Sequence, residues 1–307
     1  MSKTSQGAAS IDLEMIAGSF YIPKNDPDNP LGDDSHFIDE VVQVIGVADG
    51  FGGGKYAREL MGKVAEKVKI RRYPVTSLNP KYDLKDAFSN SWSTGACTVC
   101  IIALDENLLK AVNVGDSGFM VIRGGKVVYT SPVQHKAFDC PYLMGKTTGG
   151  GPGLAEDLQV QVEAGDVIIA GTDGLFDNLF PEEIEAIVKV SLEQNDIKPN
   201  LLAESLAKAA LEKSLDRSCK SPYGVAAQAA GLEYSGGKSD DITVVAGYVR
   251  AYSKAKVHKF CSCCNWWSPN SEFRNKKTYY PRKRNDYTSV LNRYEENAGT
   301  PVYYIPK

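Results

Sequence analysis

The sequence predicts an α+β protein whose strands are mostly joined as antiparallel hairpins. Two short polar turns carry this prediction, residues 105–107 and 123–125, because each separates two apolar runs of strand length. Apolar residues at helical spacing, such as Leu60 and Val64, predict a helix over residues 56–68. No repeat with a period of about 20 to 50 residues is visible in the sequence, which excludes a solenoid.

The remaining elements are predicted from the same signals in chain order. Residues 23–34 form a loop, because they hold three prolines and four aspartates. Helices are expected to begin at Asp83, read as an N-cap that opens a helix ending at Trp92, at Pro181 in a first turn, and at Asn200 as a cap. The predicted strands cover residues 11–22 (as one strand or two), 41–47, 96–104, 108–114, 119–122, 126–129, 158–163, 166–172 and 240–249, and residues 131–156 are expected to be irregular.

Charge divides the chain into three predicted segments. Residues 1–18 are read as an N-terminal extension, residues 19–250 as the main domain, and residues 251–307 as a basic, aromatic tail outside the main fold. The tail holds eleven Lys or Arg against four Asp or Glu, a charge of +7, so that the preceding 250 residues carry −10. Its run over residues 274–293 suits an anionic surface such as a membrane or a nucleic acid, with a solvated tail as the preferred alternative.

Composition argues against several classes of protein. A net charge of −3 gives no general argument for nucleic-acid binding. The longest apolar run, residues 99–104, is too short to cross a bilayer, and residues 1–10 lack the apolar core of a secretory signal. Seven cysteines do not make a complete disulfide set, so we expect a reducing compartment, with the cytoplasm as the default. We also expect a monomer.

Carboxylates follow or precede strands at three places. Asp49 and Asp173 each end an apolar run and are each followed by glycine, while the pair Asp240 and Asp241 precedes a strand. Hard divalent cations prefer oxygen ligands, and a chain with only three histidines favours Mg²⁺ or Mn²⁺ over zinc. One Asp-Gly pair is an ordinary turn. The joint pattern, which also includes Asp34 and Asp116, predicts a centre of two metal ions that hydrolyses a phosphate ester.

Other motifs have weaker support. The stretch 52–57 fits a dinucleotide fingerprint, but the acidic residue expected about 20 positions later is missing. The stretch 115–118, Gly-Asp-Ser-Gly, resembles a serine-protease nucleophile motif without a matching histidine base. Cys97 and Cys100 are read as core residues, and His135 as a surface histidine.

A cysteine cluster in the tail leaves several readings open. His258, Cys261, Cys263 and Cys264 offer ligands that zinc prefers, but their spacing fits no standard zinc motif. S-acylation or plain free thiols are equally open for these cysteines.

Six motifs in order resemble the metal-dependent protein phosphatases (PPM, or protein phosphatase 2C), from about Ser19 to Val249. They read D-D-S-H-F, V-A-D-G-F-G-G, S-T-G-A-C-T, N-V-G-D-S-G, G-T-D-G-L-F-D and K-S-D-D-I-T-V. The loop from Phe138 to Leu143, with Ser221-Pro222-Tyr223, looks like the branch whose members often work in mitochondria or plastids. The resemblance implies two antiparallel sheets packed face to face and flanked by helices, a four-layer α-β-β-α sandwich. It also implies hydrolysis of phosphoserine or phosphothreonine on proteins by a metal-activated water.

The resemblance implies roles for individual residues. Asp49 would bridge two metal ions, Gly50 would offer its carbonyl, and Asp173 and Asp240 would complete the ligands. Asp49 and Asp173 are therefore the predicted catalytic residues. Four further aspartates are implied around this centre: Asp34 with Asp33 in an outer shell, and Asp116, with help from Asp177, at a weaker third metal position.

Two departures from the family pattern affect the predicted chemistry. Many members carry a histidine after the first Asp-Gly, proposed as general acid, where this chain has Phe51. Many carry an arginine that binds the substrate phosphate, where this chain offers only Lys24, which lacks the bidentate fork. The alternative to the enzyme is therefore a pseudophosphatase that binds phosphoproteins or acts as a scaffold.

Overall fold

The computed structural model describes residues 12–70, 78–146, 148–194 and 197–252. The chain divides into two units, Met1–Ser253 and Lys254–Lys307. The predicted tail, including its cysteine cluster, lies outside the described residues.

Two five-stranded antiparallel sheets form the centre of the first unit. Their strand orders are β1-β14-β13-β8-β9 and β12-β7-β6-β3-β2. Two-stranded pairs, β4-β5 and β10-β11, lie beside them in the described chain. The strands are β1 (Asp12–Ile22), β2 (Ser35–Asp39), β3 (Val44–Ala48), β4 (Gly50–Phe51), β5 (Ala96–Cys97), β6 (Val99–Asp105), β7 (Leu108–Val114), β8 (Gly118–Arg123), β9 (Lys126–Thr130), β10 (His135–Ala137), β11 (Cys140–Pro141), β12 (Glu156–Gln161), β13 (Val167–Gly171) and β14 (Ile242–Tyr252).

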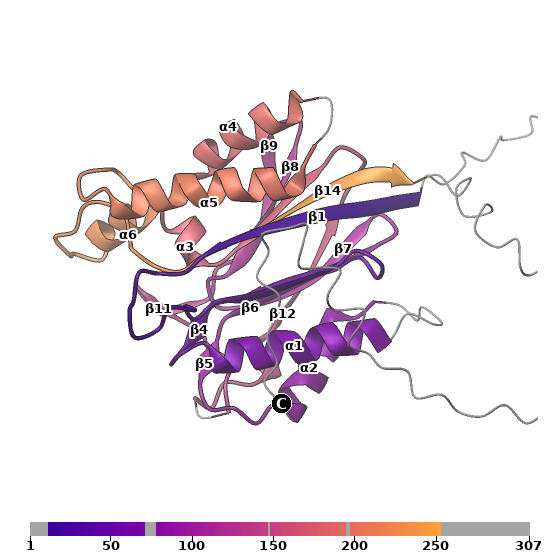
Figure 1. Cartoon of the computed structure of the whole chain (residues 1–307), viewed down its shortest axis with the longest axis horizontal. Helices are drawn as coiled ribbons and strands as arrows, with labels where there is room; N and C mark the ends of the chain where they lie inside the picture. The colour runs from indigo at the N-terminus through magenta and orange to yellow at the C-terminus, as the bar shows by residue number, and fades with distance from the viewer. Residues whose placement is uncertain (1–11, 71–77, 147, 195–196, 253–307) are drawn as a thin grey trace, which may run out of the picture. The chain divides into compact units, whose positions relative to one another are not determined.

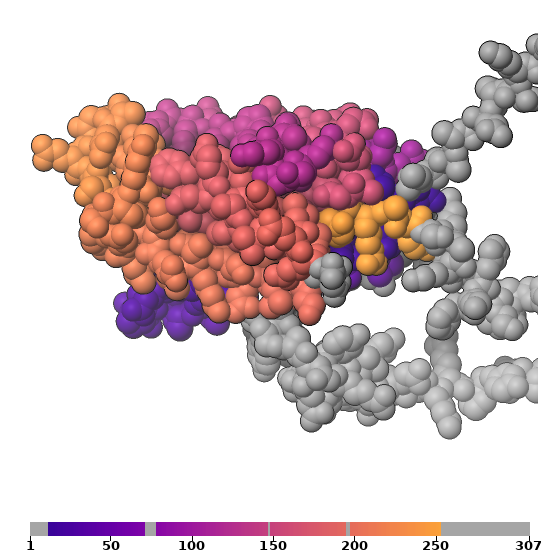
Figure 2. Space-filling model, turned by 90° about the horizontal axis from the view of Figure 1, so that it is seen from above, coloured from indigo at the N-terminus to yellow at the C-terminus, as the bar shows by residue number. Residues whose placement is uncertain are grey.

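Helices cover the outer face of each sheet (Figure 1). α1 and α2 pack on the sheet that contains β3 and β6, while α4 and α5 pack on the sheet that contains β13 and β14. In the view of Figure 2 the salmon and orange segments, from α4 through α5 to α6, cover much of the face that is seen. The helices are α1 (Lys55–Ile70), α2 (Pro80–Asn90), η1 (Pro152–Leu154), α3 (Asp173–Phe176), α4 (Pro181–Leu192), α5 (Pro199–Leu215) and α6 (Pro222–Ala229).

Three apolar cores separate these four layers. The middle core lies between the sheets and joins Ile45 and Ile102 of one sheet to Phe119 and Ile168 of the other. The outer cores join each sheet to its helices. Because β3 is covered on both faces, all five of its residues are buried and it lacks polar alternation. The predicted four-layer α-β-β-α sandwich is confirmed.

The edges of several elements differ from the sequence prediction. β1 begins at Asp12 and pairs with β14 along its whole length, so that residues 12–18 belong to the sheet and not to an extension. Only two of its eleven residues are fully buried, because it is an edge strand, and its pattern is therefore weak. β2 precedes the predicted strand at residues 41–47, which forms only from Val44.

Two predicted helix caps are wrong. Asn79, not Asp83, caps α2: its side chain accepts from the backbone N–H of Tyr82, and Pro80 takes the first turn. Asn200 lies inside α5, whose N-cap position is Lys198, and its side chain accepts a hydrogen bond from the backbone of Ser19 instead. In both helices a proline opens the first turn ahead of the polar residue that suggested a cap.

The fold brings distant strand ends to one end of the sandwich. β3 and β13 belong to different sheets, and the segments that follow them, β4 and α3, lie at the same end of the molecule (Figure 1). The predicted carboxylates are therefore collected where the two sheets meet at this end.

None of the described helices is long and apolar enough to cross a membrane.

Candidate active site

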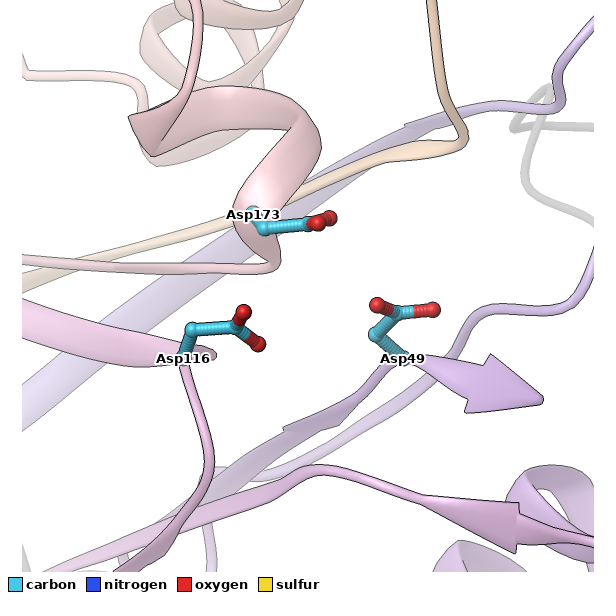
Figure 3. A group of neighbouring side chains, drawn as sticks. All are labelled: Asp49, Asp116 and Asp173. Carbon is cyan, nitrogen blue, oxygen red and sulfur yellow. The ribbon is translucent and has the colours of Figure 1, made fainter. Parts of the chain in front are cut away.

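Three of the predicted carboxylates face one another. Asp49 lies between β3 and β4, Asp116 between β7 and β8, and Asp173 begins α3. One carboxylate oxygen from each lies within 4.8 Å of the others (Figure 3). Each residue comes from a different part of the chain, so the fold, rather than local sequence, creates this cluster.

Asp49 is held through its backbone. Its N–H donates to Thr98 Oγ1 at 3.1 Å, and the N–H of Thr98 donates to the Asp49 carbonyl at 2.9 Å. The Thr98 hydroxyl also lies 2.6 Å from that of Ser117, the neighbour of Asp116. Thr98 is fully buried and thus links the segments that carry two of the three carboxylates.

Three buried carboxylates share one arrangement, in which one oxygen is held and the other has no partner among the described residues. Asp34 Oδ2 accepts from the hydroxyls of Thr172 and Thr243, at 2.8 and 2.7 Å. Oδ2 of Asp116 and Oδ2 of Asp173 are held by His135 Nε2 (2.8 Å) and Lys238 Nζ (2.5 Å). In each residue Oδ1 is the orphaned atom. Buried oxygens of this kind are costly unless a cation or donor meets them, and hard divalent cations fit them.

The electrostatics of the carboxylates also indicate a cation-binding site. Burial, followed by repulsion from Asp173, Asp34 and Asp240, raises the pKa of Asp49 well above its usual range. Burial and neighbouring carboxylates also raise the pKa of Asp116 and Asp240, and raise that of Asp177 to about 7. A site that holds this much negative charge favours bound cations, which relieve the repulsion. The residues present therefore fit the predicted Mg²⁺ or Mn²⁺ centre.

The structure distinguishes the two neighbouring aspartates at the start of β14. Asp241 is buried and accepts from the Tyr21 hydroxyl and from the backbone N–H groups of Lys24 and Asp33, at 3.2, 2.6 and 2.7 Å. Asp240 and Asp241 both line a cavity of about 170 Å³ with Asp49 and Gly50, but Asp240 also lies beside Lys238, whose Nζ is 3.4 Å from Asp240 Oδ2. Asp240 therefore faces the cluster, while Asp241 ties β14 to the loop before β2.

Comparisons with known proteins decide the family. No family model matches the chain. The probable protein phosphatase 2C 55 of Arabidopsis thaliana is 42% identical over 255 residues, which cover 80% of this chain and 54% of the relative. The probable protein phosphatase 2C 1 of Oryza sativa subsp. japonica is 31% identical over 266 residues, with 80% and 78% covered. The chain belongs to the protein phosphatase 2C family.

Solved structures agree with this assignment. The X-ray structure of the photosystem II phosphatase PBCP matches with a TM-score of 0.70 and 29% identity, covering 78% of this chain and all of that one. The catalytic domain of the phosphatase PstP, solved with two manganese ions, matches with a TM-score of 0.54 at 18% identity and supports the shared fold alone. The chain spans a little over half the length of several curated relatives, such as 54% of the protein phosphatase 2C 55 and 53% of the rice protein phosphatase 2C 71.

Lys24 and Phe51, the two departures from the protein phosphatase 2C pattern, lie at the rim of the site. The Lys24 side chain is about half exposed, and its Nζ lies 3.9 Å from Asp240 Oδ1. Phe51 is 69% exposed and follows Asp49 and Gly50 directly. Its ring has no proton to donate.

Sequence reasoning missed two residues that touch the carboxylates of this phosphatase 2C site. His135, read from sequence as a surface histidine, contacts Asp116, and Lys238 contacts Asp173. Neither residue lies in a periodic segment, and the contacts join positions 19 and 65 residues apart. In the sequence, Lys238 is the first residue of the K-S-D-D-I-T-V motif. Its residue type and position alone do not indicate that its side chain turns towards the aspartates.

Proposed function

We propose that this chain is a protein serine/threonine phosphatase that hydrolyses phosphoserine and phosphothreonine with two Mg²⁺ or Mn²⁺ ions. The observation that carries the proposal is the set of orphaned carboxylate oxygens of Asp34, Asp116 and Asp173 around Asp49, in a chain of the protein phosphatase 2C family. When bound, two such metal ions supply an activated water and neutralise charge on the transferred phosphoryl group.

Individual residues receive the following roles in this proposal. Asp49 is assigned as the bridging ligand, because it lies near both Asp116 and Asp173 and also lines the cavity with Asp240. Gly50 offers its carbonyl, and Asp173 and Asp240 complete the ligand set. Asp49 and Asp173 are thereby the catalytic residues of the proposal.

Two acidic residues lie around this set. Asp34 serves in an outer shell, since two threonine hydroxyls occupy one of its oxygens. Asp116 lies beside Asp49 and Asp173 and adds its orphaned Oδ1 to the acidic surroundings of the two ions.

The substrate phosphate is assigned to the rim of the cavity. Lys24 supplies the positive charge there, and its exposed position suits contact with a ligand that arrives from solvent. A lysine contributes a point charge rather than a planar fork, so its grip on the phosphate is less directional than that of an arginine.

Turnover with and without metal tests the proposal. The full chain with Mn²⁺ is expected to hydrolyse p-nitrophenyl phosphate and a phosphothreonine peptide, and EDTA is expected to abolish both activities. Asp49→Asn with a wild-type melting temperature is the control for a contaminating phosphatase. If folded, manganese-loaded protein turns over neither substrate, the enzyme assignment is wrong and the pseudophosphatase alternative replaces it. The cluster of Asp49, Asp116 and Asp173 and the orphaned oxygens around it support the enzyme over that alternative.

We also propose a mitochondrion or plastid as the compartment, in place of the cytoplasm that the sequence predicts by default. The branch-like loop with Phe138 and the similarity to the photosystem II phosphatase PBCP support this compartment. A fluorescent fusion of the natural full-length protein that remains in the cytosol would contradict it.

A further inference from the structure

Lys238 lies among four carboxylates at the candidate metal centre. Its Nζ is 2.5 Å from Asp173 Oδ2, 2.9 Å from Asp177 Oδ2, and 3.4 Å from both Asp240 Oδ2 and Asp139 Oδ1. The side chain is only 18% exposed. A buried lysine with this many acidic neighbours is a central part of the site and not a solvated surface charge.

The surroundings hold Lys238 in this position. Asn178, which is fully buried, accepts from the Lys238 N–H at 3.0 Å and donates its side-chain amide to the Lys238 carbonyl at 2.9 Å. Nζ also lies 5.3 Å from the centre of the Tyr223 ring, a distance at which a cation is attracted to the ring face. The Tyr223 hydroxyl in turn donates to Asp139 at 3.2 Å. Backbone and side chain are thus both fixed before any ligand binds.

The preceding glycine makes this placement possible. A Cβ on Gly237 would lie 2.1 Å from the carbonyl oxygen of Lys213, at the end of α5. Only a glycine allows the two backbones to approach this closely. The Gly237-Lys238 step is therefore shaped by the contact with α5, which directs the lysine towards the centre.

The ammonium group compensates charge where a metal ion would otherwise be needed. Six carboxylates repel one another at this end of the sandwich, those of Asp34, Asp49, Asp116, Asp173, Asp177 and Asp240. Two divalent ions would leave part of this charge unbalanced. Lys238 bonds to Asp173 and Asp177 together, and it leaves Oδ1 of Asp173 without a partner.

We propose that Lys238 is a fixed cation that takes the place of a third divalent ion between Asp173 and Asp177, so that the centre works with two exchangeable ions. The inference rests on the proposed function for its metal centre, and it assigns to a side chain the charge compensation that a third ion would supply. It also gives Asp177 a role, as the second anchor of the lysine. Because the lysine is covalently attached, this charge cannot be lost when metal is scarce.

Counting bound manganese tests the proposal without any assay of turnover. Protein stripped with a chelator and then freed of it is dialysed to equilibrium against Mn²⁺, and bound metal is measured by elemental analysis. Wild type and Lys238→Arg, which keeps the charge, are expected to bind two ions. The two neutral replacements, Lys238→Met and Lys238→Gln, are expected to bind three, because the empty space between two carboxylates then accepts a divalent cation.

Lys208→Met is the matched control. Lys208 forms an exposed pair with Glu204 on α5, so the substitution breaks a Lys–carboxylate pair away from the site and should leave two ions bound. Two ions in either folded neutral variant, or three in the wild type, would overturn the proposal. Wild-type protein that binds two ions yet shows no phosphatase activity would contradict the proposed function and leave the role of Lys238 standing. Either neutral variant suffices if the other does not fold.

Discussion

The two Asp-Gly pairs at the centre are alike in sequence and held in opposite ways. Asp49 is fixed through its backbone by two hydrogen bonds with Thr98. Asp173 is fixed through its side chain, by Lys238. The comparison shows that the same local motif can supply a carboxylate with or without a dedicated partner. A carboxylate held only by its backbone keeps both oxygens available, which suits the bridging position proposed for Asp49.

Glycine is required in both pairs for the same structural reason. A Cβ on Gly50 would lie 2.3 Å from the carbonyl oxygen of Asp33, and one on Gly174 would lie 1.9 Å from that of Asp241. Neither glycine has a positive φ. Each is required because another acidic segment passes close to its backbone, so the glycines allow the dense packing of aspartates at this end of the fold.

Replacing either aspartate by asparagine is expected to have the largest effect. Asp49→Asn and Asp173→Asn should each lower kcat with Mn²⁺ on the order of a thousandfold, because a lost metal ligand removes several kcal/mol of transition-state stabilisation. Steady-state kinetics on p-nitrophenyl phosphate measure the loss, and circular dichroism checks the fold. A folded variant with more than a tenth of wild-type kcat would contradict the ligand assignment of that residue.

Substitutions of Asp240 and Asp241 are expected to affect different properties, activity in the first case and stability in the second. Asp240→Asn should abolish most activity and leave the melting temperature nearly unchanged. Asp241→Ala should lower the free energy of unfolding by about 2–3 kcal/mol, because three donors lose a charged acceptor. Urea unfolding and kinetics on both variants make the comparison. The reverse pattern, a destabilised Asp240→Asn and a stable, active Asp241→Ala, would show that the two roles are exchanged.

Adding one methyl group tests the reason for the glycines. Gly174→Ala should destabilise the fold by about 1–3 kcal/mol, because its Cβ would overlap the Asp241 carbonyl. Gly62→Ala, in the middle of α1 with no atom within 4 Å of its Cβ, is the control and should be neutral or stabilising. Equal melting temperatures for the two variants would remove the close-approach argument.

Removing the hydroxyl that holds Asp49 is expected to have the smallest effect. Thr98→Val keeps the shape of the side chain but leaves the Asp49 N–H without its acceptor, which should cost about 1 kcal/mol of stability. Thr98→Ser, which keeps the hydroxyl, should lose less. A Thr98→Val protein as stable and as active as wild type would show that the backbone of Asp49 needs no clamp.

The strand ends and their carboxylates could be predicted because they are local features. An apolar run followed by Asp-Gly is visible within a few residues, and the six motifs in order implied both the sandwich and the positions of Asp49, Asp173 and Asp240. Errors arose where a local signal had two readings. Asp83 resembled an N-cap, but Asn79 precedes the proline that starts α2. Residues 12–18 show little alternation, because β1 lies at the edge of its sheet.

Sequence by itself determined that carboxylates gather at strand ends, and only the tertiary structure decided what each carboxylate oxygen contacts. The hydrogen bond from Lys238 to Asp173 spans 65 residues, and that from Thr172 to Asp34 spans 138. Such contacts depend on how two sheets pack against each other, which no short pattern encodes. The same packing places Asp240 beside Lys238 and joins Asp241 to the loop before β2, although the two residues are adjacent in the chain.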